Sequence, residues 1–289
     1  MKDYIICMDV SGDITIDAAK KMNLVFLQMD YSLGSEMKTL STILDYDGIK
    51  AFYDGQRNGD LTKTTQITPF LFEEYLSKYM EEGKSVLYLG LSKGLSKTYE
   101  SALLAKESLK ESYPDSDLYV VDTRSATGGL GVLVERAYRN KEKGMSIVEN
   151  FNDLNDIASR IKHFFMVQDL MYLKRGGRIS ATAATFATVL NIKPILKINQ
   201  EGKLETVSKK RGNKGALKEL FETFKNDVDL ESNDVVYIID ADASNESEFL
   251  MNKVNEFFPT ITIRKSSLNP IIGAHTGPGM VAICYIGKK

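Results

Sequence analysis

Apolar runs of strand length alternate with segments of helical periodicity in the first half of the chain. Tyr4–Met8 and Leu24–Tyr31 are typical of strands, and Ile16–Met22 between them is typical of a helix. The same pattern predicts helices at Pro69–Glu82, Thr98–Ser112 and about Val132 to Lys143, the last after Gly128-Gly129-Leu130-Gly131, and strands at Val86–Leu91 and Leu118–Val121. This alternation predicts a parallel sheet with helices on both faces.

The second half has a different pattern. Gln200-Glu201-Gly202-Lys203 lies between two apolar segments and indicates a hairpin, which implies antiparallel pairing. The fold class expected is therefore α/β with two domains: a Rossmann-like parallel α/β/α N-terminal domain over residues 1–154 and an α+β two-layer C-terminal domain over residues 155–289. Helices are predicted at Ile147–Ile161, Lys214–Asp227 and Glu246–Phe258, and strands at His163–Val167, Pro194–Ile198, Val235–Ile239 and Val281–Ile286.

Composition narrows the class of protein. The 289 residues are 43% hydrophobic, and the 37 basic and 39 acidic residues give a formal net charge of -2. Such a balance provides no overall field for nucleic acid or a membrane surface. Cys7 and Cys284 each lie in an apolar run, as buried structural cysteines do. Because no signal peptide and no run of ~20 apolar residues is present, we expect a soluble cytoplasmic protein without stable membrane insertion.

Two loops rich in hydroxyl groups precede predicted helices. Lys63-Thr64-Thr65-Gln66-Ile67-Thr68-Pro69 comes before one helix, and the turn containing Ser92, Ser96 and Thr98 comes between a strand and the next helix. Each loop is explained by ordinary helix capping when taken alone. However, ligands of open α/β sheets bind beyond the carboxyl ends of the strands, where helix N-termini favour anions. The two loops could therefore converge on one anionic ligand.

A third polar loop, Asn269 to Gly279, contains His275 between glycines. This histidine could donate a hydrogen bond, act as a general base or be a structural loop residue. With only two histidines and no His-Glu-x-x-His spacing, we expect no metal site. A serine hydrolase could combine Ser96 and His275 with Asp9 or Asp122, although the Gly-x-Ser-x-Gly elbow is missing around Ser96.

The remaining motifs give little indication of phosphate or nucleotide binding. The chain has neither a Gly-x-x-x-x-Gly-Lys-Ser/Thr loop nor Gly-x-Gly-x-x-Gly, so nucleotide binding is unsupported and no cofactor is expected. Asp9-Val10-Ser11-Gly12-Asp13 is explained most simply by an Asx turn. The basic stretch Lys209–Lys214 is typical of a solvated surface. In contrast, Tyr172-Leu173-Lys174-Arg175-Gly176-Gly177-Arg178-Ile179 has two glycines between arginines, which allows close approach of a partner or a phosphate.

Taken together, these segments resemble the DegV family of bacterial fatty-acid-binding proteins, which includes the binding subunits of fatty acid kinase. The resemblance extends over nearly the whole chain and depends on the order and spacing of short motifs. These are Asp9–Asp13, Thr64-Thr65-Gln66, Leu95–Tyr99, Asp122-Thr123 with Gly128–Gly131, Asp169–Ile179, Lys210-Arg211-Gly212 and His275-Thr276-Gly277-Pro278-Gly279.

The resemblance implies a long-chain fatty acid, such as palmitate, buried between the two domains. It implies that Thr64 and Ser96 hold the carboxylate, that His275 belongs to the nearby polar network, and that Arg175 is associated with a kinase partner. The protein would then be a carrier and not an enzyme, presenting the fatty acid to a separate kinase that forms the acyl phosphate. The alternatives are a serine hydrolase or esterase using Ser96 and His275, and a regulatory protein whose basic loops bind another macromolecule.

Overall fold

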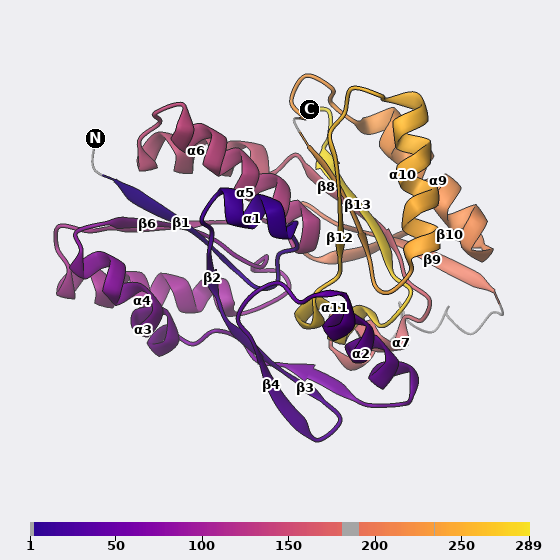
Figure 1. The fold of residues 1–289 in the computed structure, drawn as a ribbon, viewed down its shortest axis with the longest axis horizontal. Coiled ribbons are helices and arrows are strands. Elements are labelled where there is room, and N and C mark those ends of the chain that lie inside the picture. Colours follow the sequence, from indigo (N-terminus) through magenta and orange to yellow (C-terminus); the bar gives the residue numbers. More distant parts are fainter. Residues whose placement is uncertain (1–2, 181–190, 234) are drawn as a thin grey trace.

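The computed structural model describes residues 3–180, 191–233 and 235–289. A four-stranded sheet forms the centre of the N-terminal part, with all neighbouring strands parallel. Helices α3 and α4 cover one face of this sheet, and α5 and α6 cover the other (Figure 1). In sheet order the strands are β2 (Val25–Leu27), β1 (Tyr4–Asp9), β6 (Ser85–Leu89) and β7 (Leu118–Val121); the helices are α3 (Pro69–Glu81), α4 (Thr98–Ser112), α5 (Thr127–Glu142) and α6 (Ile147–Ala158).

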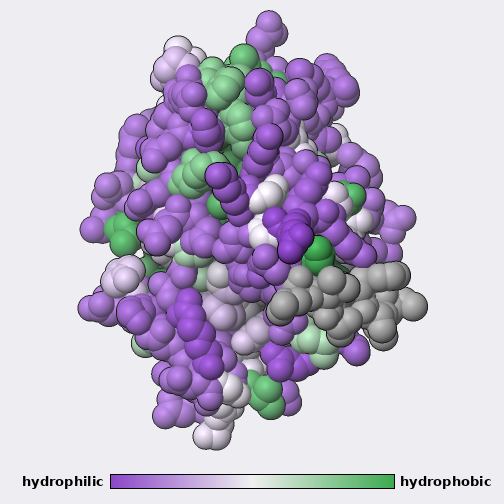
Figure 2. Space-filling model, turned by 90° about the vertical axis from the view of Figure 1, so that its right-hand side faces the viewer, coloured by the Kyte–Doolittle hydropathy of each residue, from purple (hydrophilic) through white to green (hydrophobic). Residues whose placement is uncertain are grey.

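A six-stranded mixed sheet forms the centre of the C-terminal part. Its order is β10 (Leu204–Arg211), β9 (Ile192–Ile198), β8 (Ile161–Met166), β13 (Val281–Ile286), β11 (Val236–Asp240) and β12 (Ile263–Ser267), antiparallel except for the β11–β12 pair. Helices α9 (Gly212–Asp227) and α10 (Ser244–Phe257) pack on its outer face (Figure 1). Figure 2 views this side of the molecule and shows mostly hydrophilic side chains, as expected where amphipathic helices turn their polar face to solvent.

Helix α5 lies between the two sheets, because it packs on β1 and β6 and also on β8, β11 and β13. Its glycines make this close packing feasible. A Cβ atom at Gly128 would lie 2.6 Å from the Cβ of Tyr237, and one at Gly131 would lie 2.6 Å from the carbonyl oxygen of Asp13. The prediction that the helix starts near Val132 was therefore wrong: these glycines lie inside the helix, where a missing side chain allows close contact with the second sheet.

The segment predicted as one strand, Leu24–Tyr31, forms two. Its first part is β2 in the parallel sheet, whereas β3 (Met29–Leu33) pairs antiparallel with β4 (Glu36–Leu40) and β5 (Thr62–Thr64) in a separate three-stranded sheet. An apolar run indicates burial without specifying the pairing partners, so the division was not visible in the sequence. No element was predicted at β4, α2 (Tyr46–Arg57) or β12, whereas α1 (Ile16–Lys21) was predicted.

Further boundaries differ at segments that carry polar residues. Helix α6 ends at Ala158, and Ile161, predicted as helical, begins β8. The expected loop from Asn269 contains a helix, α11 (Pro270–Thr276), whose N-cap Asn269 accepts a hydrogen bond from the backbone N–H of Ile272. The Arg-rich segment contains the short helix α7 (Met171–Arg175). Helix α11 was missed because Pro270, Gly273 and the Gly277-Pro278-Gly279 that follows are typical of loops, whereas Pro at the first helical position is compatible with a helix.

The predicted fold class is confirmed: a parallel sheet flanked by helices is followed by a separate mixed sheet with its own helical layer. The boundary between residues 154 and 155 stays a prediction. Both cysteines are buried and free, as expected. In the part of the chain that the structure describes, no helix has the length and apolar character required to cross a membrane.

Candidate functional site

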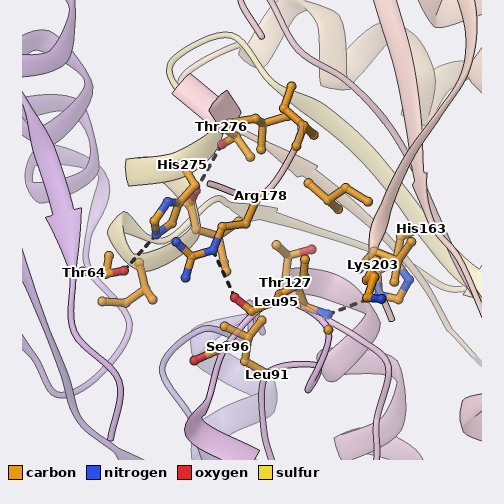
Figure 3. Close-up of a pocket in the computed structure, with 18 of the residues that line it drawn as sticks. Thr64, Leu91, Leu95, Ser96, Thr127, His163, Arg178, Lys203, His275 and Thr276 are labelled. Atoms are coloured by element: carbon orange, nitrogen blue, oxygen red, sulfur yellow. Dashed lines mark hydrogen bonds between the residues drawn. The ribbon is translucent and has the colours of Figure 1, made fainter. Parts of the chain in front are cut away.

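A cavity of about 910 Å³ lies between the two halves of the molecule. The turn after β6, the end of β5 and helix α11 contribute residues to it, together with strands β8, β9, β10 and β13 of the large sheet. The predicted residues Thr64, Ser96 and His275 all line this one cavity (Figure 3). The fold therefore brings together residues far apart in sequence, such as Thr64 and His275, which are separated by 211 positions.

The inner face of the large sheet supplies an apolar surface to this cavity. Phe165 of β8 lies opposite Ala282 of β13, and Ile198 of β9 lies opposite Leu204 of β10. All four residues line the cavity, as do Met280 and Ile271. Polar side chains, His163 and Thr206, lie on the same strands and also line the cavity. The mainly apolar part of this lining favours an apolar ligand, because polar atoms there would lose their hydrogen bonds to water.

Thr64 and His275 form a direct pair at one side of the cavity. Thr64 is the last residue of β5, and His275 lies in the last turn of α11. The Oγ1 atom of Thr64 lies 2.8 Å from Nε2 of His275 (Figure 3). Burial, with a smaller contribution from the charge of Arg178, lowers the pKa of His275 to about 4, so the ring is neutral at pH 7.

Ser96 lies in the turn before α4 and is partly tied into that helix start. Its Oγ accepts a hydrogen bond from the backbone N–H of Thr98 at 3.2 Å and lies 2.9 Å from Oγ1 of Thr98. The expected hydroxyl cap is therefore supplied by Ser96, while Lys97 at the N-cap position makes no side-chain cap. At the other loop, Thr68 caps α3, as predicted from the Thr-Pro pair.

The two arginines of the Arg-Gly-Gly-Arg segment have different positions. Arg175 is exposed, does not line the cavity, and lies with its guanidinium carbon 4.5 Å from the ring centre of Tyr172. Arg178 does line the cavity, and its Nε donates to the carbonyl oxygen of Leu95 at 3.1 Å (Figure 3). Sequence reasoning noted the segment but did not identify Arg178 as a cavity residue; the turn at Gly176 and Gly177 between the two arginines was the available signal.

The charge of the cavity lining is positive. Its described residues include four cationic side chains and no carboxylate: Lys93, Lys97, Arg178 and Lys203. Lys93 pairs with Asp122 at 2.7 Å, and Lys203 pairs with Glu201 at 2.9 Å. Lys97 has a 75% exposed side chain and lies 3.4 Å from Glu100. Arg178 forms no ion pair with any described residue, so its charge is available to an anion.

The geometry does not assemble the serine hydrolase alternative. The ring of His275 contacts Thr64, and the hydroxyl of Ser96 contacts Thr98. Asp9 is engaged elsewhere, because its carboxylate accepts from the hydroxyl of Tyr88 at 2.6 Å and from the backbone N–H groups of Ser11 and Leu91. The bond to Ser11 is the expected Asx turn. Asp122, the other candidate acid, pairs with Lys93.

The second histidine, His163 of β8, also lines the cavity and is buried (Figure 3). His163 is 3% exposed, and its Nε2 accepts from the backbone N–H of Ala126 at 3.4 Å. Burial lowers its pKa to about 3, so it is neutral. Within residues 3–180, 191–233 and 235–289, no group of three or more His, Cys, Asp or Glu side chains is arranged to hold a metal ion.

The chain is similar to known proteins over nearly its whole length. The family model described as "Uncharacterised protein, DegV family" matches residues 4–288. A DegV domain-containing protein of Clostridium perfringens is 35% identical over 287 residues, covering 99% of this chain and 98% of the relative.

Two solved structures share the fold. Protein TM841 of Thermotoga maritima, reported to reveal a fatty acid binding function, is 26% identical, with a TM-score of 0.84 and coverage of 100% of both chains. The Fak B3 protein of Streptococcus pneumoniae fatty acid kinase, solved with linoleic acid, is 20% identical, with a TM-score of 0.84 and coverage of 99% of this chain and 100% of that chain. At that identity the Fak B3 likeness is one of fold. From the sequence match and the shared architecture together, the chain belongs to the DegV family.

Proposed function

We propose that this protein binds one long-chain fatty acid, such as palmitate, in the cavity between its two sheets, with the carboxylate held by the hydroxyl groups of Thr64 and Ser96. The observation that carries the proposal is the division of the cavity lining. Hydroxyls, a neutral histidine and an arginine without an ion pair among the described residues gather on one side, and the face of the large sheet is mainly apolar, with His163 and Thr206 as its polar members.

The neutral state of His275 determines how Thr64 can serve a carboxylate. Its Nδ1 is buried and lacks a hydrogen-bond partner among the described residues. The neutral ring is therefore more stable with its proton on Nε2, where it donates to the oxygen of Thr64. The hydroxyl hydrogen of Thr64 is then free to donate to the ligand. His275 therefore supports the carboxylate site by orienting the hydroxyl of Thr64.

Ser96 and Arg178 complete the head-group site in this proposal. The Ser96 oxygen accepts the N–H of Thr98, which leaves its own hydrogen available to a carboxylate when Thr98 donates in their shared hydroxyl contact. The guanidinium of Arg178 donates to the carbonyl oxygen of Leu95, one residue before Ser96. Arg178 thus supports the turn and adds a positive charge that favours an anionic head group.

Affinity would come mainly from the acyl tail. At about 0.8 kcal/mol per buried CH₂ group, a long chain contributes on the order of 10 kcal/mol of gross transfer free energy. The head group then needs orientation and satisfied hydrogen bonds more than a strong ion pair.

We further propose that the bound fatty acid is presented to a fatty acid kinase and that Arg175 contacts this partner. The chain has no phosphate-binding glycine loop, which supports placing phosphoryl transfer on another protein. Arg175 is exposed at the end of α7, three residues before the cavity residue Arg178, so a protein that contacts Arg175 would lie close to the proposed head group.

The identity of the ligand is tested by denaturing the purified protein, extracting it with organic solvent and analysing the released lipids by mass spectrometry. We expect fatty acid in about equimolar amount. Titration with a fatty acid and with the alcohol of equal chain length then tests the head group, and the acid is expected to bind more tightly. If the protein releases no lipid, binds neither compound and hydrolyses an acyl ester, the hydrolase hypothesis replaces the carrier proposal.

The kinase step is tested separately by mixing the loaded protein, ATP and a fatty acid kinase catalytic subunit and measuring acyl phosphate. We expect Arg175→Gln to slow this transfer without changing fatty acid affinity. Unchanged transfer by this variant would remove Arg175 from the partner contact.

A further inference from the structure

The turn between β6 and α4, residues 91–97, contains Ser96 and is called the head-group turn below. It contacts the hairpin between β9 and β10 in the other half of the molecule. The Oγ atom of Ser92 donates to the carbonyl oxygen of Gly202 at 2.8 Å and accepts from the N–H of Gly94 at 3.2 Å. Both Ser92 and Gly202 are buried. A hairpin tip is usually exposed, so a buried glycine there marks a contact that the fold maintains.

The contact is also sterically close. A Cβ atom at Gly94 would lie 2.5 Å from both the carbonyl carbon and the carbonyl oxygen of Gly202, which are backbone atoms that cannot move without the hairpin. Gly202 has a φ of 77°, a conformation that favours glycine. The two glycines therefore let two backbones from different halves of the molecule meet directly.

Sequence neighbours of both contact residues line the cavity described above. Gly94, Leu95 and Ser96 line it from the turn, and Ile198, Lys203 and Leu204 line it from the hairpin. Strand β10 is an edge strand and pairs with β9, whereas β9 also pairs with β8, and helix α9 packs on both strands of the hairpin. An edge hairpin can move away at lower cost than a central strand, because fewer hydrogen bonds are lost.

We infer that the Ser92–Gly202 contact is a latch that controls entry and exit of the acyl chain, and that it couples this movement to the head-group site. The coupling follows from the turn itself, because the backbone N–H of Ser96 donates to the carbonyl oxygen of Ser92 at 3.1 Å. When the latch opens, the hairpin leaves the cavity and the turn loses the bond that fixes Ser92. This inference deepens the proposed function and rests on it for the identity of the ligand.

The latch is tested by locking it. A Cβ atom at Gly202 would lie 3.5 Å from the Cβ of Ser92, which matches the Cβ–Cβ separation of about 3.5–4.5 Å in disulfides. In a Ser92→Cys, Gly202→Cys variant, the native Cys7 and Cys284 are fully buried and should stay reduced. Release of cis-parinaric acid into excess palmitate, followed by stopped-flow fluorescence, should be slow in the oxidised form and recover on reduction. The reduced form of the same variant controls for strain at residue 202.

Two single substitutions should have the opposite effect. Ser92→Ala removes the bond to Gly202 and the bond from the N–H of Gly94, and should speed uptake and release together by at least fivefold to tenfold, the factor that corresponds to one bond of about 1 kcal/mol. Gly94→Ala should speed both steps through its clash with the hairpin. Gly215→Ala is the matched control, because a Cβ there meets its nearest neighbour, Lys210, at an ordinary 3.6 Å.

Hydrogen–deuterium exchange in the ligand-free protein tests directly whether the Ser92–Gly202 contact opens. Oxidation of the double-cysteine variant should slow exchange in peptides covering residues 91–97 and 198–204, and Ser92→Ala should speed it. Equal release rates and equal exchange in oxidised and reduced protein overturn the latch. If the wild-type protein binds no fatty acid, the proposed function fails, while exchange in these two peptides still confirms or refutes the latch.

Discussion

Replacing His163 by Gln should make the protein more resistant to mild acid. His163 is buried, has no carboxylate partner among the described residues and accepts a hydrogen bond at Nε2 from Ala126. Protonation would place an uncompensated charge in the interior, which is why burial lowers the pKa of this ring from 6.5 to about 3. Glutamine keeps an oxygen that can accept the Ala126 N–H and cannot titrate.

The magnitude follows from proton linkage. Above pH 6.5 neither state binds the proton, and His163 does not change stability with pH. As the pH falls from 6.5 towards about 3, the unfolded chain takes up a proton that the folded chain refuses, so stability is lost through this whole window. Between pH 7 and pH 5, this difference removes about 2 kcal/mol from the free energy of unfolding, a large part of the 5–15 kcal/mol typical of a folded protein.

Urea unfolding at pH 7 and pH 5, followed by circular dichroism, measures this difference for the wild type and for His163→Gln. The variant should lose about 2 kcal/mol less than the wild type over this range. The comparison cancels other titrating groups, including Asp13, whose pKa burial raises to about 7 and which therefore opposes the loss of stability as the pH falls. Equal losses in the two proteins, at unchanged urea dependence, would show that His163 is not held neutral by burial.

Three further predictions concern the cavity and its supporting helix. Thr64→Val should weaken fatty acid binding about fivefold to tenfold in a fluorescence displacement assay because one hydroxyl is lost, and should lower the melting temperature modestly because the ring N–H of His275 loses its acceptor; unchanged affinity would remove Thr64 from the head-group site. Arg178→Gln should weaken binding of the acid more than of the corresponding alcohol, whereas Arg175→Gln should change neither, and an equal loss for both ligands would argue against a charge contribution. Gly129→Ala should lower thermal stability strongly, since its Cβ would lie 1.9 Å from Nε2 of His163, and Gly215→Ala provides the tolerated control; equal melting temperatures would contradict the packing of α5.

Most regular elements could be predicted because their periodicity is local. The helix Thr98–Ser112 and the strands Leu118–Val121 and Val281–Ile286 have the predicted bounds. The errors lie where tertiary contacts overrule local preference. Gly128–Gly131 are helical because α5 packs between two sheets, and the run Leu24–Tyr31 divides because its two parts pair with different strands.

The sequence identified three candidate residues that line the cavity, but not how their side chains are arranged. Motif resemblance selected Thr64, Ser96 and His275, and the structure brings all three to one cavity. It could not distinguish Arg175 from Arg178, because the direction of each side chain depends on the turn at Gly176 and Gly177. The contact of Ser92 with Gly202 was equally invisible, since it joins residues 110 positions apart.

The sequence by itself determined the alternating architecture, the hydroxyl-bearing turns and the absence of nucleotide-binding loops. These properties are encoded by neighbouring residues through periodicity, capping and turn chemistry. Only the tertiary structure decided that the Thr64 hydroxyl meets a neutral histidine, that Arg178 and not Arg175 lines the cavity, and that the β9–β10 hairpin contacts the turn containing Ser92. These properties depend on distances between segments remote in sequence and on burial, which shifts pKa values and removes water, and neither is written in any local stretch of the chain.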